Sequence, residues 1–260
     1  MDLLFLGTGA ADWAMVPNDE DKNDMGAKIR RPSSMLIDSH ILIDPGPSSF
    51  EFAKFLGVDL SRITDIFITH THCDHYNAES LLNFSKSANR KINLWLHKNA
   101  VDEVVTDNNM TLNPVNEFCE YSTEYFKVTP LTANHEVDGS DEQPLHYYFE
   151  IDGKTLFYGC DGGWLLSRTC SFFSKHKFDC AVLDTTVGDY DGDVRLGSHN
   201  SIPMVRMIRE YMYKNNMATK DTLFVMSHLA RTLHTSIADT QKAMQKENFI
   251  VAYDSMRISF

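Results

Sequence analysis

The sequence feature that most restricts the fold of this chain is a cluster of metal-binding residue types directly after an apolar, strand-like run. Residues 65–69 read DIFIT, and residues 70–75 then read HTHCDH. In an extended segment alternate side chains share a face, so His70 and His72 can bind one metal ion. The chain is expected to turn into a helix at this point, which would direct Asp74 and His75 toward a second ion.

The donor types in this cluster suit particular metals. Imidazole and carboxylate together favour zinc, and they also accept manganese or iron. The alternative is a polar, solvated turn without a ligand. Histidine is rare in this chain, with 11 among 260 residues, so three histidines and an aspartate within six positions favour the metal-binding interpretation.

Strand-like and helix-like stretches follow one another along the chain, which predicts an α/β or α+β layered fold in a single domain over residues 1–260. The Asp152-Gly153 pair between two strand-like runs predicts a hairpin. The predicted strands are Leu3–Leu6, Ser34–Ile37, Ile41–Ile43, Asp65–Thr69, Ile92–Leu96, Phe126–Leu131, Tyr147–Ile151, Thr155–Tyr158, Cys180–Leu183 and Leu223–Met226. The predicted helices are Ala78–Ser87, Trp164–Ser174, Ile202–Tyr213 and Ile237–Lys246.

Two metal ions need more ligands than one cluster supplies. His135, Asp161 and His228 each come just after a predicted strand, and Asp161 is followed by Gly162-Gly163. Side chains at the ends of neighbouring strands converge on one rim of a sheet, which is the usual place for an α/β site. These three residues are therefore candidate ligands.

The motifs of the chain resemble those of a known family. HTHCDH matches the HxHxDH signature of the metallo-β-lactamase superfamily, and Asp44 lies upstream of it in LIDPG. The opening LGTGAA and the closing VAYDSMRISF resemble the branch that holds phosphoribosyl cyclic phosphate phosphodiesterases. The resemblance spans essentially the whole chain, and its motifs are specific for the superfamily rather than for one substrate.

The resemblance implies an αββα sandwich, in which two mixed β-sheets are flanked by helices. It also implies a binuclear centre that holds two divalent ions, which would be Zn or Mn, and Fe is also compatible. It implies that a first metal binds His70, His72 and His135, and a second binds Asp74, His75 and His228. Asp161 would bridge the two ions, and Asp44 would hold the histidine cluster through hydrogen bonds. Asp74 is also counted among the catalytic candidates.

One segment departs from the family pattern. Members of the phosphodiesterase branch often carry a cysteine cluster for a structural zinc after the first strand, and Pro17–Arg31 has no cysteine here. This difference leaves the exact substrate open without affecting the metal motifs. The acidic loops Pro17–Asp24 and Asp189–Asp193 lack the glycine and glutamate positions of a calcium loop, so solvated loops are predicted. Cys73 occupies a variable position of the signature.

Three further residues are candidates for lesser roles. A leaving alkoxide needs a proton, and His234, six positions after His228, is the candidate donor because the resembling branch has a histidine near this position. His199 precedes the helix predicted from Ile202; it either supports the ligands, as the resemblance implies, or is an ordinary loop histidine. Arg231 could contact a phosphate, but a solvated arginine is the favoured interpretation.

Charge and cysteine content limit the partners and the compartment. The net charge of −12 disfavours long nucleic acid, although bound metal ions can reverse the charge inside a site. Five cysteines without a CxxC pair indicate no disulfide framework, so a cytoplasmic protein is predicted. The first residues predict a strand rather than a signal peptide, and no apolar stretch is long enough to cross a membrane. The resemblance also suggests a homodimer.

These features leave several functions to compare. The first is a phosphodiesterase for a small or cyclic phosphodiester, and the second is a hydrolase of esters, thioesters or lactones with the same centre. A nuclease of the tRNA 3′-processing kind shares the signature, but the acidic charge and the lack of an obvious basic arm count against it. A non-catalytic member of the fold is disfavoured because all seven ligand positions are present.

Overall fold

The computed structural model describes residues 1–17, 29–88 and 90–260. The chain divides into two compact units. Unit 1 contains Met1–Asn116, Val137–Gln143 and Tyr253–Ser259, and unit 2 contains Glu117–Glu136, Pro144–Ala252 and Phe260. The acidic segment predicted at 17–24 lies outside the described residues except for Pro17. No helix in the described part of the chain is long and apolar enough to cross a membrane.

The sheet of unit 1 is mixed, with the strand order β14-β1-β2-β3-β4-β5-β6. The pairs among β14, β1, β2 and β3 are antiparallel, whereas β3, β4, β5 and β6 run parallel. The strands are β1 (Asp2–Gly7), β2 (Ser34–Ile37), β3 (Ile41–Ile43), β4 (Asp65–Phe67), β5 (Ile92–His97), β6 (Met110–Val115) and β14 (Arg257–Ser259).

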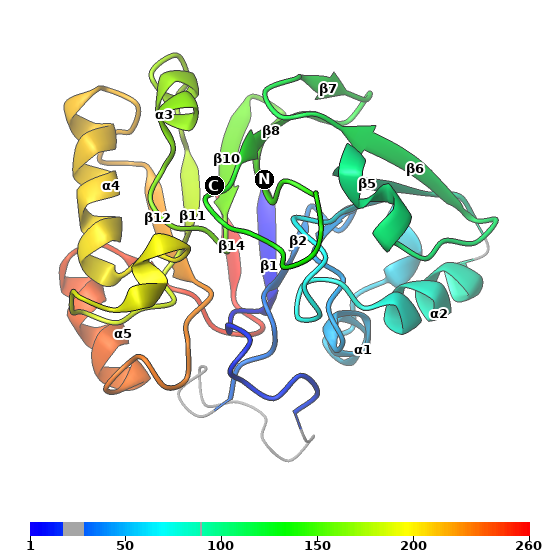
Figure 1. Ribbon diagram of the computed structural model, residues 1–260, viewed down its shortest axis with the longest axis horizontal. Helices are drawn as coiled ribbons and strands as arrows, with labels where there is room; N and C mark the ends of the chain where they lie inside the picture. Colours follow the sequence, from blue (N-terminus) through cyan, green and yellow to red (C-terminus); the bar gives the residue numbers. More distant parts are fainter. Residues whose placement is uncertain (18–28, 89) are drawn as a thin grey trace. The chain divides into compact units, whose positions relative to one another are not determined.

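One face of this sheet is covered by helices α1 (Ser49–Phe55) and α2 (Ala78–Ala88) (Figure 1). Alternate residues of the strands face them, and Leu4 and Leu6 of β1 belong to the same core as Phe50 of α1 and Phe84 of α2. The rings of Phe50 and Phe84 stack with their centroids 4.3 Å apart. Burial of this apolar face is what holds two short helices on the sheet. Two 3₁₀ helices, η2 (Leu60–Arg62) and η3 (Lys98–Glu103), complete the connections.

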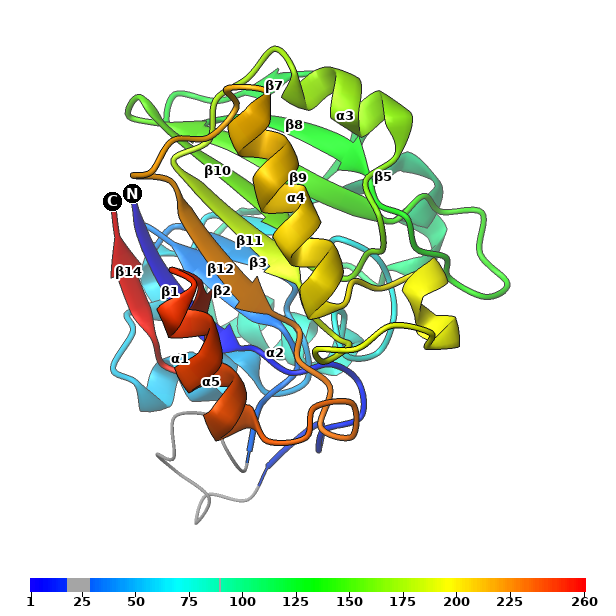
Figure 2. The ribbon, with the colours of Figure 1, turned by 90° about the vertical axis from the view of Figure 1, so that its left-hand side faces the viewer.

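The sheet of unit 2 is also mixed, with the order β13-β12-β11-β10-β9-β8-β7. Strands β7 to β10 pair antiparallel, and β10 to β13 run parallel. The strands are β7 (Tyr121–Ser122), β8 (Lys127–Thr132), β9 (Leu145–Ile151), β10 (Lys154–Gly159), β11 (Cys180–Asp184), β12 (Leu223–Ser227) and β13 (Ile250–Val251). Helices α3 (Ser167–Phe173), α4 (Ile202–Lys214) and α5 (Ile237–Lys246) pack on it, and Figure 2 shows α4 and α5 running across the face of the parallel strands.

Most predicted elements are present with small shifts of their ends. The hairpin at Asp152-Gly153 joins β9 to β10, and both turn residues have positive φ, as such turns require. The helix predicted from Trp164 begins only at Ser167, and the strand predicted to Thr69 ends at Phe67. The loop predicted at Asp189–Asp193 is a loop, and η4 (Val194–Gly197) follows it.

The left-handed backbone conformation recurs where parallel strands end. Asp44, Asp161 and His228 have φ values of 55°, 57° and 58°, and they follow β3, β10 and β12 respectively. Residues with a side chain adopt this conformation rarely, and such exceptions cluster at functional sites. The strand ends of both units are therefore the places to look for chemistry.

Candidate metal centre

The HTHCDH segment of unit 1 gathers nitrogen and oxygen donors within a few ångströms. Nε2 of His70 lies 2.9 Å from Nδ1 of His72, and the two rings meet edge to face. Nε2 of His75 lies 3.4 Å from Oδ2 of Asp74. The turn forms because the backbone N–H groups of His75 and Tyr76 both donate to the carbonyl of His72. Converging imidazole nitrogens beside a carboxylate are a donor set that fits a divalent ion.

The buried carboxylate of Asp44 forms hydrogen bonds to the residues next to and within the HTHCDH segment. Asp44 accepts hydrogen bonds from the backbone N–H and the hydroxyl of Thr69, at 2.8 and 3.0 Å, and its Oδ2 lies 2.9 Å from Nδ1 of His75. Burial raises the pKa of Asp44, while the nearby His75 acts in the opposite direction. Because Nδ1 of His75 contacts Asp44, a metal ion at this histidine would bind Nε2.

The glycine of the LIDPG segment is required by close approach. A Cβ added to Gly46 would lie 2.4 Å from the carbonyl oxygen of Asp74, which is backbone and cannot move aside easily. The turn after Asp44 therefore packs directly on the histidine segment, and only glycine permits that contact.

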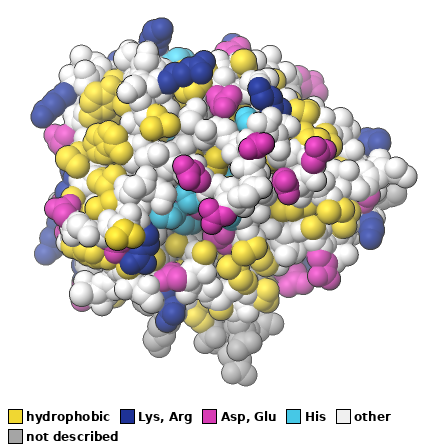
Figure 3. Space-filling view, in the orientation of Figure 1, with side chains coloured by type: hydrophobic (Ala, Val, Ile, Leu, Met, Phe, Trp, Pro, Cys, Tyr) yellow, Lys and Arg dark blue, Asp and Glu magenta, His cyan; other side chains and the backbone are white. Residues whose placement is uncertain are grey.

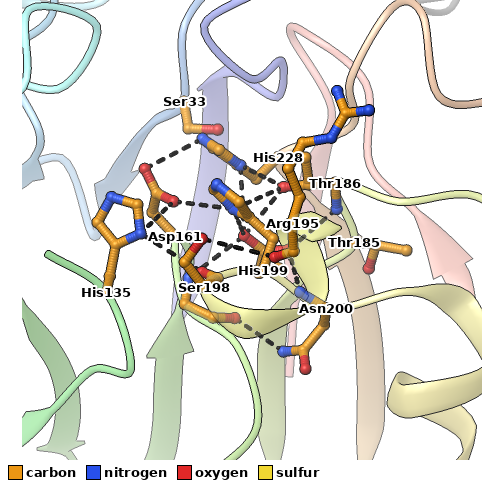
Figure 4. Close-up of polar contacts among 12 residues, drawn as sticks. Ser33, His135, Asp161, Thr185, Thr186, Arg195, Ser198, His199, Asn200 and His228 are labelled. Carbon is orange, nitrogen blue, oxygen red and sulfur yellow. Dashed lines mark hydrogen bonds and ion pairs between the residues drawn. The ribbon is translucent and has the colours of Figure 1, made fainter. Parts of the chain in front are cut away.

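Unit 2 has its own cluster around Asp161, shown in Figure 4. Oδ1 of Asp161 lies 3.5 Å from Nδ1 of His135, and Oδ2 lies 3.5 Å from Nε2 of His228. His199 also approaches this carboxylate, with Nδ1 3.1 Å from Oδ1. The two oxygens of this carboxylate thus lie next to different histidines of unit 2.

Asp184 is a functional candidate that the sequence reasoning missed. It lies at the end of β11, is fully buried, and accepts from the backbone N–H groups of Thr186 (2.9 Å), Asn200 (3.0 Å) and, at 3.3 Å, Gly162. Its Oδ2 also lies 3.0 Å from Nδ1 of His199. Burial alone would raise the pKa of Asp184, but contacts with histidines outweigh it and hold the pKa well below its usual range.

Asp184 is linked to the candidate ligand His228 through Thr186. The hydroxyl of Thr186 bonds to Asp184 at 3.0 Å and lies 2.8 Å from Nδ1 of His228. Within unit 2, one donor atom each from Asp161, Asp184, His199 and His228 lies within 4.8 Å of the others, so this group alone could hold a cation. The signal that could have found Asp184 is its position at the end of a strand between those that precede Asp161 and His228.

Comparison with known proteins identifies the family. The model of the β-lactamase superfamily domain matches residues 39–235 of the chain, which is most of its length and includes all seven predicted ligands. The chain belongs to the β-lactamase superfamily. No curated protein sequence matches the chain.

Solved structures of the superfamily share the fold. The metallo-β-lactamase fold protein YhfI from Bacillus subtilis has a TM-score of 0.75 and 12% identity, with coverage of 99% of this chain and 98% of that one. A diphosphatase from the PhnP family has a TM-score of 0.70 and 16% identity, covering 100% and 97%. Human tRNase Z, short form, has a TM-score of 0.68 and 19% identity, covering 100% and 99%. These matches confirm the predicted fold of two mixed sheets flanked by helices, and the superfamily is one of metal-dependent hydrolases.

Two histidines of this superfamily member were assigned lesser roles from the sequence. His199 lies in the loop between η4 and α4, and from there it contacts Asp161 and Asp184, as described above. His234 is buried, and its Nε2 lies 3.0 Å from the carbonyl oxygen of Thr185, the residue directly after Asp184. Arg231 is exposed. The contact with Thr185 anchors His234 beside the end of β11 in unit 2.

A histidine to which the sequence gave no role, His146 on β9, is buried directly beneath the Asp161 turn. A Cβ on Gly162 would lie 2.5 Å from Nε2 of His146, so the two residues are in close contact. Burial lowers the pKa of His146 from 6.5 to about 4. In the unfolded chain this histidine binds a proton below pH 6.5, whereas in the folded protein it does so only below about pH 4.

Replacement of His146 should therefore remove part of the acid sensitivity. Because the unfolded state takes up the proton first, stability falls as the pH drops from 6.5 toward 4, by about 2 kcal/mol between pH 7.5 and pH 5. Urea unfolding of chelator-treated wild type and His146→Gln at both pH values measures this difference. An equal loss of stability in both proteins would contradict the assignment.

Proposed function

We propose that this chain is a binuclear metal-dependent phosphodiesterase that acts on a small or cyclic phosphodiester. In this proposal the two units are halves of one hydrolase domain over residues 1–260. The observation that carries it is the carboxylate of Asp161, whose two oxygens face the two different histidines His135 and His228. The resemblance of the chain ends to the phosphodiesterase branch supports the choice of substrate class.

The assignment of ligands follows the superfamily pattern. His70, His72 and His135 would hold the first ion, and Asp74, His75 and His228 would hold the second. Asp161 would belong to both ligand sets. Zinc and manganese both suit this mixture of imidazole and carboxylate, and iron is compatible with it. When bound, the two ions supply Lewis acidity toward the phosphoryl oxygens and activate the attacking water.

Residues that form hydrogen bonds to the proposed ligands orient the imidazole rings. Asp44 bonds His75 at Nδ1, and the Thr186 hydroxyl, itself bonded to Asp184, contacts Nδ1 of His228. In both cases Nδ1 is engaged and Nε2 faces the ligand position. Such partners fix the ring and its tautomer, and their loss costs about 10- to 100-fold in metal affinity or activity.

Two histidines can carry the proton for the leaving alkoxide. His234 is the candidate suggested by the sequence, and His199 is the one whose Nδ1 lies 3.1 Å from Asp161. The residue that delivers the proton contributes about 10²- to 10⁴-fold to the rate with a poor leaving group and much less with p-nitrophenolate. Comparison of His199→Ala and His234→Ala on alkyl and aryl phosphodiesters assigns the role. Equal losses on both substrates would exclude both residues as the donor.

The test of the proposed function measures metal content and turnover on the same sample. Protein purified without chelator is analysed for elements and assayed with bis(p-nitrophenyl) phosphate, alongside Asp161→Ala and His72→Ala. His40→Ala, which removes an exposed histidine, is the matched control. Two ions per chain with turnover in wild type and control, and loss in both ligand variants, are expected. Protein that holds almost no metal would refute the proposal.

Other outcomes would redirect the substrate class. Two ions without phosphodiester turnover would favour esters, thioesters or lactones, which the same centre can hydrolyse. Cleavage of a tRNA precursor at low protein concentration would favour the nuclease. Against the nuclease stands the net charge of −12, and Figure 3 shows many acidic side chains on the face that it draws.

A further inference from the structure

A short segment of the chain is anchored on unit 1 by three neighbouring residues. Residues 137–143, here called the strap, belong to unit 1, although the residues on both sides of it belong to unit 2. The side-chain amide of Asn99 donates to the carbonyl of Asp141 at 2.9 Å, and the backbone N–H of Gln143 donates to Nδ1 of His97 at 3.1 Å. The strap begins two residues after the candidate ligand His135.

Between these two anchors, Glu142 reaches the histidine segment. Its Oε1 accepts a hydrogen bond from the hydroxyl of Thr71 and a longer one, 3.3 Å, from the backbone N–H of Thr71. Glu142 is only 6% exposed. The other carboxylate oxygen, Oε2, is buried and has no hydrogen-bond partner among the described residues.

A carboxylate in this position lowers the free energy of unfolding. Burial of a charged group costs free energy unless its hydrogen bonds are satisfied, and here one oxygen is not. A buried polar atom without a partner calls for a reason other than stability. An apolar side chain of similar size would cover Thr71 at lower cost, but it could not bond to it.

Thr71 is the residue between His70 and His72. The peptide groups on both sides of Thr71 are planar, so hydrogen bonds that hold its side chain and its N–H restrict the directions of both neighbouring histidines. His70 and His72 converge to 2.9 Å between Nε2 and Nδ1. The bonds from Glu142 to the hydroxyl and the peptide N–H of Thr71 are the kind of contact that sets this convergence.

We propose that Glu142 is a positioning residue for the first metal ion, acting through Thr71 on His70 and His72. Because the strap follows His135 directly, the same anchor also restrains the loop of the third ligand of that ion. This inference rests on the proposed function, in which these three histidines share one ion. The second ion, assigned to Asp74, His75 and His228, has its own support in Asp44 and Thr186 and does not depend on Glu142.

The experiment is a Zn²⁺ titration of the chelator-treated full chain against a chromogenic chelator, which resolves the two binding steps. We expect Glu142→Ala to weaken one step by about 10- to 100-fold and to leave the other within twofold. Asp141→Ala removes an exposed carboxylate from the same strap and should match wild type. Glu142→Gln keeps an oxygen that can accept from Thr71, so it should stay within about threefold of wild type if position rather than charge matters.

Thr71→Val removes the hydroxyl that donates to Glu142 and leaves the sequence of the strap unchanged. It should weaken the same step, and the double variant with Glu142→Ala should be no worse than the poorer single variant, because both remove one interaction. This variant keeps the proposal testable if Glu142→Ala does not fold.

The possible results separate the two claims. Wild-type protein that binds no zinc would defeat the proposed function itself, before any variant is compared. Two normal binding steps in Glu142→Ala and Thr71→Val would overturn only the inference about Glu142. Equal weakening of both steps, or a Gln variant as poor as the Ala variant, would also overturn it, since the effect would then be general destabilisation or charge.

Discussion

Asp161→Asn is expected to lower phosphodiester hydrolysis on the order of a thousandfold or more and to remove at least one of two bound ions, because no other residue is assigned to both ions. Asparagine keeps the shape of the side chain, but it loses the negative charge and one of the two acceptor oxygens. Those oxygens face His135 and His228 at 3.5 Å each. Initial rates and elemental analysis of the same preparation measure both losses.

The choice of asparagine controls for the backbone. Asp161 has a φ of 57°, a conformation that asparagine accepts more readily than alanine, so a loss in Asp161→Asn reports on the carboxylate rather than on the turn. Asp221→Asn, at an exposed position, is the matched control. An Asp161→Asn protein that retained both ions and a tenth of the activity would contradict the bridging role.

Asp184→Ala is expected to have the largest effect on stability. The change leaves several buried donors around β11 without their acceptor, among them the N–H groups of Thr186 and Asn200 and the ring of His199. Loss of one partner of a buried charged network costs about 3 to 5 kcal/mol. For a chain of this size that corresponds to a fall in Tm of about 10 °C. Thermal unfolding of chelator-treated protein measures it without the contribution of metal.

Asp184→Asn separates packing from charge in this network. It keeps one acceptor oxygen but places an amide where two donors now point, so we expect most of the loss of stability to remain. Asp221→Ala, at an exposed position of the same unit, is the control and should change Tm by about 1 °C or less. A Tm for Asp184→Ala within 2 °C of wild type would show that the network does not hold the end of β11.

The sequence predicted the elements whose signals are local. The apolar runs at β2, β3 and β12 and the turn at Asp152-Gly153 are contained within a few residues, so pattern alone located them. The elements that it missed depend on distant partners. β13 has two residues and β14 three, and each forms only because a neighbouring strand is already present. β6 contains Pro114, which argues against a strand unless the strand lies at an edge, as it does here.

The candidate site divides in the same way. The HTHCDH cluster is visible because its donors are adjacent in the sequence. His135, Asp161 and His228 were found from their places after predicted strands and from the superfamily pattern. Glu142 and His146 could not be found in this manner, and for Asp184 the only signal in the sequence was its place at the end of a predicted strand. Each acts through a partner on another segment, and the partner is identified only when the order of the strands and the path of the strap are known.

Pairing of β14 with β1 has a consequence for how the chain folds during synthesis. β14 and Asp254, which bonds to Thr8 and to the backbone of Arg31, leave the ribosome long after β1, because Asp254 follows Thr8 by 246 positions. The part of unit 1 up to Asn116 is made first, its segment Val137–Gln143 follows, and nearly all of unit 2 is also made before residues 253–259 emerge. At ordinary rates of translation the N-terminal sheet waits on the order of ten seconds for its last strand. During that time β1 presents an open edge on the nascent chain, so this is the interval in which chaperones would be needed most.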